Sequence, residues 1–344
     1  MFNDIMAPPE LNKALFGRRW RITILVPKDE NELSADVSKY IGYVVSDSDH
    51  EDTSLRVTFR IQNNGYEIPN FSEIVVYNMK PQTENLVIDA GTRVIVEAGY
   101  VNGAFGAIYD SSIFQALWER EDNTTTKVTF RCIDAMDIIY ENHVSMVQSM
   151  KYQKDMVLAM AAQSRRPFTI KKISDEIENI ELARGKVFFD SPVYYMRKYA
   201  QQSGTLPSTQ SRDIYLMRPQ DQVPKSITNQ ALVLSPGEGG LIGTPQQTQE
   251  GITFVCLLNP QLMVFKPEPM MVKIDNKIIR QLAVQYNSAG FSRLDEDGVY
   301  KILGVTHIGD TRGNEWYTQV VGCNQSMEGT LPAMFSQLNS DGQG

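Results

Sequence analysis

One pair of residues in the sequence has the types and spacing of a hydrolytic or metal site. His307 and Asp310 lie three residues apart in the segment THIGDTRGNEWYT. An imidazole and a carboxylate at this spacing could share a metal ion or form part of a hydrolytic relay, but neither a third ligand nor a nucleophile is nearby. The alternative is a tight turn between two strands. In that turn Asp310 would bond the turn backbone, Gly313 would take an unusual φ and Trp316 would pack inward. We favour the turn.

Three other motifs are incomplete versions of ligand-binding motifs. The acidic run Asp295–Gly298 lacks the rest of a calcium loop and is better explained as a hairpin turn. The glycine-rich run Pro236–Leu241 lacks the Gly-Lys-Ser/Thr ending of a phosphate loop, and its glutamate would repel phosphate, so we expect a flexible connection. Three glycines spaced nearly as in a dinucleotide fingerprint lie between two expected strands, which predicts a β-turn: Gly99, Gly103 and Gly106.

The histidines and cysteines form no recognisable catalytic or metal-binding set. His50, His143 and His307 are the only histidines and lie far apart in sequence, so nothing points to a triad. The cysteines fit neither a zinc ligand set nor a disulfide framework, which indicates buried thiols folded in a reducing cytoplasm: Cys132, Cys256 and Cys323. We therefore expect no catalytic residue, no metal ion, no cofactor and no enzymatic activity.

The elements that hold these residues are mostly strands. Leu55 to Ile61 alternates apolar and polar residues with a period of two, and Arg19 to Val26 does the same. Short turns separate further strand-like runs at 74–77, 93–98, 106–118 and 127–133. Strands at this spacing predict an antiparallel barrel or sandwich.

The period changes after residue 140. The Met-rich stretch from His143 to Ser164 lacks Gly and Pro and predicts a helix, whose methionines would form either an adaptable partner surface or part of the core. Thr169 could cap a second helix, whose isoleucines follow a narrow helical stripe: Ile170, Ile173, Ile177 and Ile180. A third helix is predicted from Pro192 to Gly204, with Ser191 as its cap.

A second β-rich stretch follows, so the expected fold is mainly β with an α insert. Strands are expected at 231–235, 252–258, 270–274, 300–308 and 315–323, while the piece from Lys277 to Tyr286 is ambiguous. The expected domains are an N-terminal arm (1–18), a first β-barrel (19–140), a helical or α+β insert (141–220), a second β-barrel (221–325) and a flexible tail (326–344).

Composition excludes several classes of protein. The chain has 344 residues and a net charge of −8, which argues against tight duplex DNA binding, because phosphate neutralisation needs clustered Lys and Arg. No run of about 20 apolar residues and no signal peptide is present, so no membrane association is expected. The small basic patch Arg18-Arg19-Trp20-Arg21 fits a docking arm better than a nucleic-acid contact at this overall acidity.

Three segments resemble the baseplate hub proteins of contractile-tailed bacteriophages. GLIGTPQQTQEGITFVCLLNP, within 231–258, and GVYKILGVTHIGDTRGNEWYTQVVGC, at 298–323, are similar to that family's second barrel. LRVTFRIQNNGYEIPNFSEIVVYNM, at 55–79, followed by VIVEAGY, at 94–100, is similar to its first barrel. The resemblance covers most of 50–325 in order, but neither the arm before residue 18 nor the Met-rich segment takes part.

The resemblance implies a structural role in a virion. Such hubs look like homotrimers with two tail-tube-like barrels per chain, so that three chains present six barrels and adapt a six-fold tail tube to a three-fold central spike. The implied partners are further copies of the chain, the tail tube protein, the central spike protein and the baseplate wedge proteins. Genomic DNA would pass through the lumen without specific binding. The implied location is the tail baseplate, after assembly in the host cytoplasm.

Two alternatives stay open. One is the hub of a related tailocin or type VI-like injection device, which shares the fold and which neighbouring genes would distinguish. The other, less favoured, is a tail-associated peptidoglycan hydrolase, for which the chain lacks a paired-acid lobe or a Cys-His module.

Overall fold

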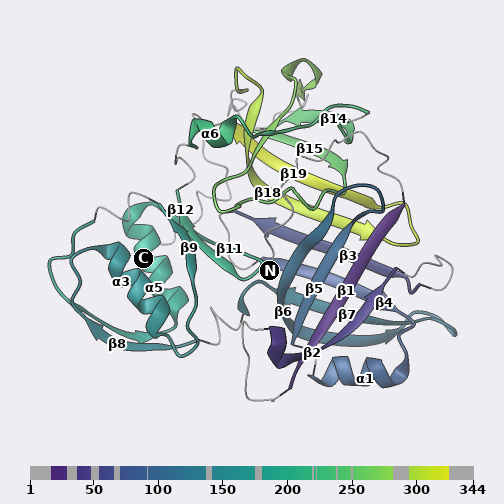
Figure 1. Ribbon diagram of the computed structural model, residues 1–344, viewed down its shortest axis with the longest axis horizontal. Coiled ribbons are helices and arrows are strands. Elements are labelled where there is room, and N and C mark those ends of the chain that lie inside the picture. Colours follow the sequence, from purple (N-terminus) through teal and green to yellow (C-terminus); the bar gives the residue numbers. More distant parts are fainter. Residues whose placement is uncertain are drawn as a thin grey trace, which may run out of the picture.

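The chain is mainly antiparallel β-structure, as the sequence predicts, with a mixed α/β unit at one end (Figure 1). A computed structural model provides the coordinates. It describes residues 17–28, 37–47, 54–65, 70–90, 92–136, 142–174, 180–218, 221, 223–237, 239–248, 251–281 and 294–324. The predicted flexible tail lies outside these residues, as does the predicted arm except for its last two positions.

The first β unit is a curled antiparallel sheet. Its strands are β1 (Arg18–Pro27), β2 (Tyr40–Ser46), β3 (Val57–Asn64), β4 (Phe71–Tyr77), β5 (Arg93–Tyr100), β6 (Phe105–Arg120) and β7 (Thr126–Ile133), in the spatial order β3-β4-β7-β6-β5-β1-β2. Helix α1 (Pro81–Ala90) and the short helix η1 (Val37–Lys39) belong to the same unit. Alternating side chains of these strands point into one core.

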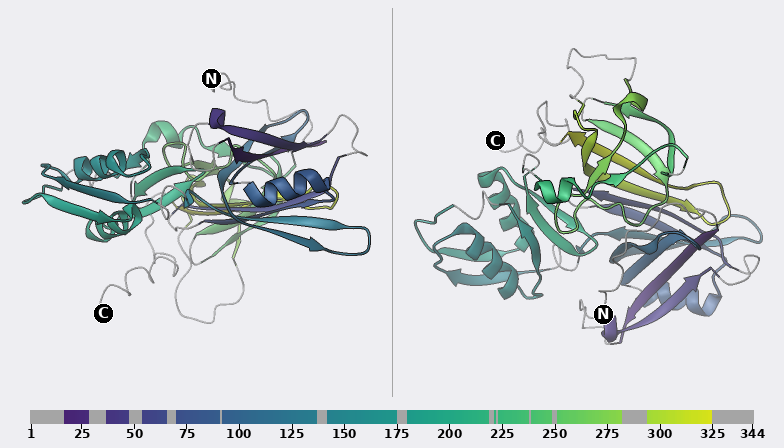
Figure 2. Two further views of the ribbon diagram at one scale, coloured as in Figure 1. Left: turned by 90° about the horizontal axis from the view of Figure 1, so that it is seen from below. Right: turned by 45° about the horizontal axis from the view of Figure 1, so that its top comes forward.

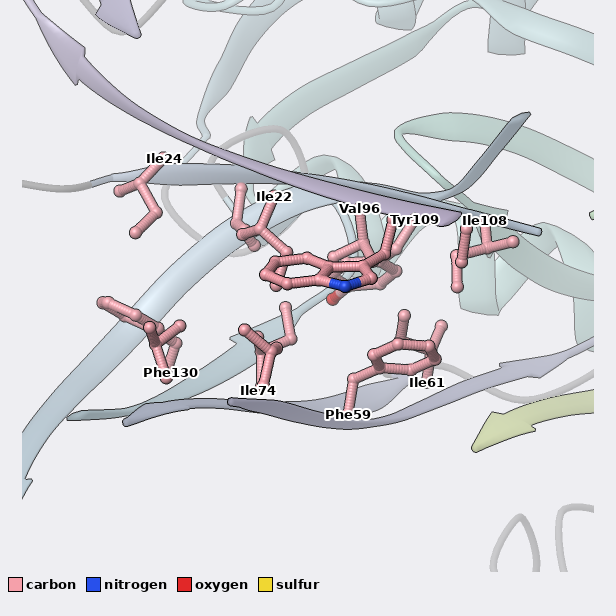
Figure 3. Close-up of a cluster of buried hydrophobic side chains, with 14 of the residues drawn as sticks. Ile22, Ile24, Phe59, Ile61, Ile74, Val96, Ile108, Tyr109 and Phe130 are labelled. Carbon is pink, nitrogen blue, oxygen red and sulfur yellow. The ribbon is translucent and has the colours of Figure 1, made fainter. Parts of the chain in front are cut away.

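That core lies between two layers of the curled sheet. Figure 3 shows Ile22, Ile24 and Val96 on one side facing Phe59, Ile74 and Phe130 on the other. The alternation at 55–61 thus marks a real strand, with Val57, Phe59 and Ile61 inward and Arg60 outward.

The second β unit has its own core and, within the described residues, seven strands. They are β13 (Leu232–Val233), β14 (Leu241–Gln247), β15 (Ile252–Leu257), β16 (Met271–Lys273), β17 (Arg280–Gln281), β18 (Val299–Asp310) and β19 (Trp316–Asn324), with α6 (Lys225–Thr228) and η3 (Asn276–Ile278) between them. The ambiguous piece begins with η3 and β17, and the rest of it lies outside the described residues.

Hydrogen bonding continues from one β unit to the other. Strand β18 pairs with β3 from Gly304↔Asn64 to Asp310↔Thr58, so the two units form one 14-stranded sheet. Two β-barrel domains were predicted from the sequence, but this ladder between them was not. In the described part of the chain no ladder joins β2 to β3, so the first unit curls over its core without closing on itself.

The insert projects sideways from the β-structure (Figure 2) and has a third core. Strands β8 (Val144–Gln148) and β10 (Lys186–Asp190) form a two-stranded sheet, and β9 (Ile170–Ile173), β11 (Leu206–Gln210) and β12 (Asp213–Met217) form a three-stranded one. Helices α3 (Gln153–Gln163) and α5 (Pro192–Ser203) pack against them. The methionines that could have formed a partner surface lie in or against this core: Met146, Met150, Met156 and Met160.

Two predicted helices need correction and one is confirmed. The stretch from His143 to Ser164 is not one helix, because its first part is β8 and only Gln153–Gln163 is helical. The predicted second helix begins as strand β9 instead. Helix α5 starts with Pro192 and ends at Ser203, before Gly204, whose left-handed φ of 65° matches the predicted stop. Ser191 stands at the predicted cap position, but its side chain makes no cap hydrogen bond.

Candidate functional site

The structure separates the His–Asp pair that the sequence singled out. Residues three apart in a strand point to opposite faces, and both lie in β18. His307 is buried, and its Nδ1 lies 3.0 Å from Oγ1 of Thr318 on β19. Burial lowers the pKa of His307 to about 4, so the ring is neutral at pH 7. A buried neutral imidazole with a hydroxyl partner is a structural group, which supports the turn interpretation.

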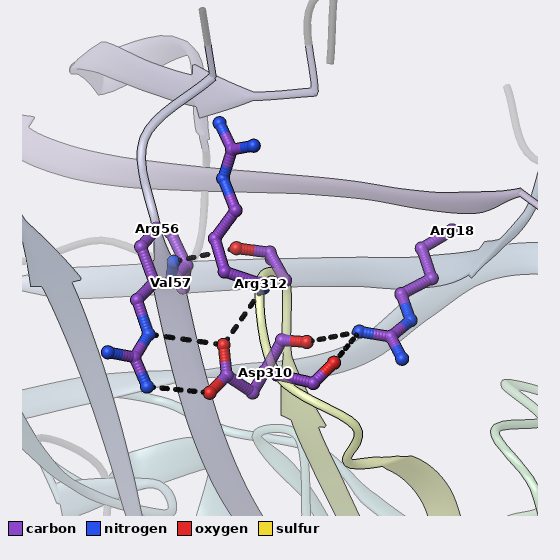
Figure 4. Close-up of polar contacts among 7 residues, drawn as sticks. Arg18, Arg56, Val57, Asp310 and Arg312 are labelled. Carbon is purple, nitrogen blue, oxygen red and sulfur yellow. Dashed lines mark hydrogen bonds and ion pairs between the residues drawn. The ribbon is translucent and has the colours of Figure 1, made fainter. Parts of the chain in front are cut away.

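Asp310 is the centre of a clamp that fastens the terminal hairpin to the first β unit (Figure 4). Its Oδ2 accepts a hydrogen bond of 2.8 Å from Arg56, and its Oδ1 accepts one of 3.3 Å from the same guanidinium. The backbone N–H of Arg312 donates to Oδ1 at 2.9 Å. Burial alone would raise the pKa of Asp310, but these donors outweigh it and hold that pKa below its ordinary value.

Arg18 completes the clamp from the opposite side. Its guanidinium donates to the backbone oxygens of Asp310 and Gly313, at 2.6 Å each (Figure 4). This contact corrects the prediction that residues 18–21 form a basic docking patch. Because they belong to strand β1, their side chains alternate: Trp20 is buried, whereas Arg21 pairs with Glu97 at 3.4 Å. Nothing in the sequence spacing links Arg18 to a turn 292 residues away.

Gly313 is required for a different reason from the one predicted. Gly313 is not one of the described residues that have a left-handed φ. A Cβ at this position would instead lie 2.4 Å from Oδ2 of Asp310, closer than real contacts allow. The close approach of the carboxylate, and not an unusual φ, therefore accounts for glycine here.

Trp316 packs inward, as predicted, but into the core of the other β unit. It is buried in the first unit's cluster, and its ring meets Phe59 edge to face with centroids 5.5 Å apart. Its indole Nε1 donates to the backbone oxygen of Gly99 at 3.3 Å. The last hairpin thus completes a core built from the start of the chain.

The incomplete ligand motifs prove to be turns. Oδ1 of Asp295 accepts from the backbone N–H groups of Asp297 and Val299, at 3.0 and 3.2 Å, and Gly298 has a φ of +69°. Gly99, Gly103 and Gly106 lie where β5 turns into β6. The glycine-rich run leads into β14. Within the residues that the structure covers, no three His, Cys, Asp or Glu side chains gather as a metal site would need.

The three cysteines are buried free thiols. Burial raises the pKa of the Cys256 and Cys323 thiols to about 12, and it raises the pKa of the Cys132 thiol as well. They are therefore protonated and unreactive near neutral pH.

A second polar cluster, which the sequence analysis missed, joins the first β unit to the insert. Asn70 donates from Nδ2 to the backbone oxygen of Thr209 on β11, at 2.8 Å, and lies 3.5 Å from Oδ2 of Asp134. Asp134 is fully buried, and its Oδ1 has no hydrogen-bond partner within the described residues. Burial raises its pKa to about 7. The only sequence signal was an acid directly after a strand.

Two surface features also stand out. Strand β2 ends the main sheet and carries no charged residue, and its Ile41 and Val44 are 49% and 59% exposed. On the outer face of β3, β4, β6 and β7, a shallow hollow is lined by Phe71 and Phe114 together with Arg60 and Arg131. In the described part of the chain no helix has both the length and the apolar character needed to cross a membrane.

No protein-family model matches the sequence, and comparison with curated proteins finds no match. Solved structures do resemble the chain. The 43 kDa tail protein of prophage MuSo2 from Shewanella oneidensis superposes with a TM-score of 0.51 at 7% identity, over 90% of this chain and 99% of that chain. A chain of the half-lidded PdpA–VgrG complex from Francisella gives a TM-score of 0.51 at 8% identity, over 90% of this chain and 58% of that one. At such identities the likeness concerns the fold, and the fold is the β-rich architecture of these two proteins.

Proposed function

We propose that this chain is a non-enzymatic structural subunit of a phage tail, and more narrowly the baseplate hub of a contractile tail. The observation that carries the proposal is the extent of the fold likeness. It spans 90% of this chain and 99% of the MuSo2 tail protein, so the likeness is not confined to a single module. Because fold alone does not fix function, surface features must support the same role.

The uncharged edge of β2 supports self-association. Monomeric proteins protect an edge strand with charges, proline or a bulge, because its free N–H and C=O groups can pair with another chain. Strand β2, with the sequence YIGYVVS, has none of these charges or prolines and exposes Ile41 and Val44. An edge of this kind suits pairing with a neighbouring copy.

The two β units per chain support a homotrimer. Each unit has its own core, so three chains would present six β units around an axis. Such a ring could meet a six-fold tail tube on one side and a three-fold spike on the other. The net charge of −8 suits a ring through which DNA passes without binding. A subunit with this role lies in the baseplate of the virion. It contacts the tail tube, spike and wedge proteins.

A type VI-like device or a tailocin is the second candidate. The observation that favours this second candidate is the similarity to a chain of the PdpA–VgrG complex. Capsid and terminase genes beside the gene for this chain would favour the phage; their absence would favour the tailocin.

Mass measurement of the purified chain tests the proposal. We expect a homotrimer in native mass spectrometry and light scattering, and a larger complex when the cognate spike protein is added. A chain that stays monomeric at high concentration and ignores the spike protein would contradict the hub role.

A zymogram on cell-wall substrate tests the absence of enzymatic activity. We expect no lysis, because the one His–Asp pair in strand β18 is split between two faces and His307 is buried. Lysis that disappears in His307→Ala, while the variant still folds and assembles, would make the chain a hydrolase.

A further inference from the structure

The outer face of the insert's two-stranded sheet is strongly apolar. Strands β8 and β10 pair with Val187 opposite Val147, and one face of the pair covers the insert core through Met146 and Phe188. The other face exposes Val147, Val187 and Phe189 to 75%, 67% and 72%. We call these three residues the distal face. Soluble surfaces carry single apolar side chains at random, but three adjacent ones on a rigid sheet mark a contact site.

The insert also differs in charge from the rest of the chain. Residues 144–217 contain 11 of the 33 Lys and Arg residues but only 7 of the 41 Asp and Glu residues. The insert is therefore net positive, whereas the remainder of the chain is strongly negative. Arg184, two residues before β10 begins, and Asp190, at the end of β10, are both exposed, so the positive charge belongs to the insert as a whole. A partner for this face should be apolar and acidic.

One projecting element of the same chain has that chemistry. Strand β5 pairs with β6 only as far as Ser112, so from Phe114 onward β6 pairs with β7 alone among the described residues. At the end of this hairpin Trp118 is 47% exposed and is followed by Glu119, Glu121 and Asp122. We call residues 118–122 the hairpin tip. It offers a large aromatic side chain, a strand edge without a second partner among the described residues, and a net negative charge, because its three acidic residues outnumber Arg120. Glu119 already pairs with Lys127 at 3.0 Å, so Glu121 and Asp122 are the acids available to a partner.

The distal face and the hairpin tip lie at opposite ends of the molecule. In Figure 1 the insert lies at one end of the longest axis and the β6–β7 hairpin at the other, and the first view of Figure 2 shows the same separation. A chain therefore cannot join its own two ends. Complementary patches on opposite ends produce head-to-tail contacts, which close into a ring when the rotation between copies allows it.

We propose that the distal face binds the hairpin tip of a neighbouring copy, with Trp118 covering Val147, Val187 and Phe189. This inference rests on the proposed ring function and names the lateral contact within it. Three side chains form a patch smaller than a stable interface of about 800 Å² per partner. The contact therefore acts together with the sheet edges, as a second point of attachment that raises the strength of the whole association.

Cross-linking between single cysteines tests which surfaces meet. The native thiols are buried and will not react. We expect chains carrying both Trp118→Cys and Phe189→Cys, treated with a bis-maleimide, to give a ladder ending at a covalent trimer. A mixture of the two single variants should give only a heterodimer. Trp118→Cys combined with Val233→Cys, at a site 57% exposed on β13, is the control and should give no product. Cross-linking of Phe189→Cys with itself would mean that distal faces meet each other, which overturns the proposal.

Removing the apolar surface tests its energetic role. Threonine preserves strand propensity, so the triple variant Val147→Thr, Val187→Thr, Phe189→Thr should fold normally. We expect its dissociation constant for self-association to rise at least about tenfold, as for loss of a central aromatic contact. The matched variant Val233→Thr should leave it unchanged.

The outcomes separate the two proposals. A wild-type chain that never self-associates contradicts the ring itself. A wild-type trimer with unchanged affinity in the triple variant, and no Trp118–Phe189 product, leaves the ring standing and overturns the contact. The contact also fails if the triple variant forms normal trimers but no longer enters particles, because the distal face would then bind another tail protein.

Discussion

Two buried titratable residues make the stability of this chain depend on pH in opposite directions. Asp134 has a folded pKa raised to about 7, and His307 one lowered to about 4, both by burial. Between about pH 4 and 7 the carboxyl of Asp134 keeps its proton in the folded chain but loses it in the unfolded chain. Its contribution to the free energy of unfolding is therefore complete below about pH 4 and is lost as the pH rises to 7. The folded imidazole is neutral, so its contribution is complete above about pH 6.5 and is lost as the pH falls to 4.

Asp134→Asn should separate these effects. The neutral amide does not titrate, so the variant should gain stability relative to wild type by about 1 kcal/mol per pH unit between pH 4 and 7. Urea unfolding of both proteins at pH 5 and pH 8 measures the difference. A difference that is the same at both pH values would mean that Asp134 ionises normally.

His307→Gln should change the pH dependence of stability only below about pH 6.5. A glutamine retains a polar partner for Thr318 without titrating, so the loss of stability that wild type suffers from pH 6.5 to 4 should become smaller in the variant. The same unfolding series at pH 4.5 and pH 7 tests this. An unchanged slope would show that the ring is already protonated in the folded chain.

Trp316→Ala tests the inward packing of the last hairpin. The ring is buried against Phe59, so its removal should lower the free energy of unfolding by about 3–5 kcal/mol. Trp118→Ala is the control, because that ring lies outside the core clusters and should cost far less. Equal losses in urea denaturation would contradict the core assignment.

At the scale of elements, the clamp around Asp310 determines how the terminal hairpin is held. Gly313→Ala would place a methyl carbon 2.4 Å from Oδ2 of Asp310, which is too close, so the carboxylate would have to move away from Arg56. We expect a loss of about 1–3 kcal/mol, typical of a broken charged hydrogen bond. In an Asp310→Ala background the same change should cost less, because no carboxylate is displaced. Additive losses in thermal unfolding would argue against this coupling.

Strands with a strict two-residue alternation were predictable, and so was helix α5 of the insert, but strands β8 and β9 of the insert were not. The alternation at 55–61 survives in the structure because one face of β3 is core. Strand β9 was wrongly predicted as a helix. The reason is that its pairing with β12 shifts register between Ile214 and Tyr215. That bulge turns both Ile170 and Ile173 toward the insert core, although residues three apart in a regular strand would face opposite ways. A bulge thus reproduces the spacing of a helical stripe.

The clamp and the buried Asp134 cluster were beyond prediction for another reason. Each joins residues far apart in the chain, such as Arg18 with Asp310 and Asn70 with Thr209. Such contacts depend on how the sheet curls and on how the insert docks, which periodicity does not specify. The motif segment that contains Asp310 was visible in the sequence, but its partners were not.

At the scale of the whole molecule, the edge of β2, which pairs with β1 alone among the described residues, should control assembly. Val44→Lys places a charge on that edge, the device by which natural proteins prevent edge pairing. We expect the variant to fold normally, since Val44 is exposed, and to be mostly monomeric in light scattering at concentrations where wild type is trimeric. The control is Val233→Lys on strand β13, which should leave the trimer intact. Trimers of the Val44 variant with wild-type stability would exclude this edge from the interface.

The ladder between β3 and β18 also determines when the protein can mature on the ribosome. The first β unit obtains the neighbour of strand β3, and the indole that fills its core, only from residues that follow Ile133, the end of its own last strand, by 171 positions or more (Gly304 onward, 304 − 133). At about 5–20 residues per second, the nascent unit waits on the order of ten seconds or more with that strand exposed. Prematurely terminated chains should therefore remain unfinished and be degraded, so that no partial subunit can enter a particle and block it.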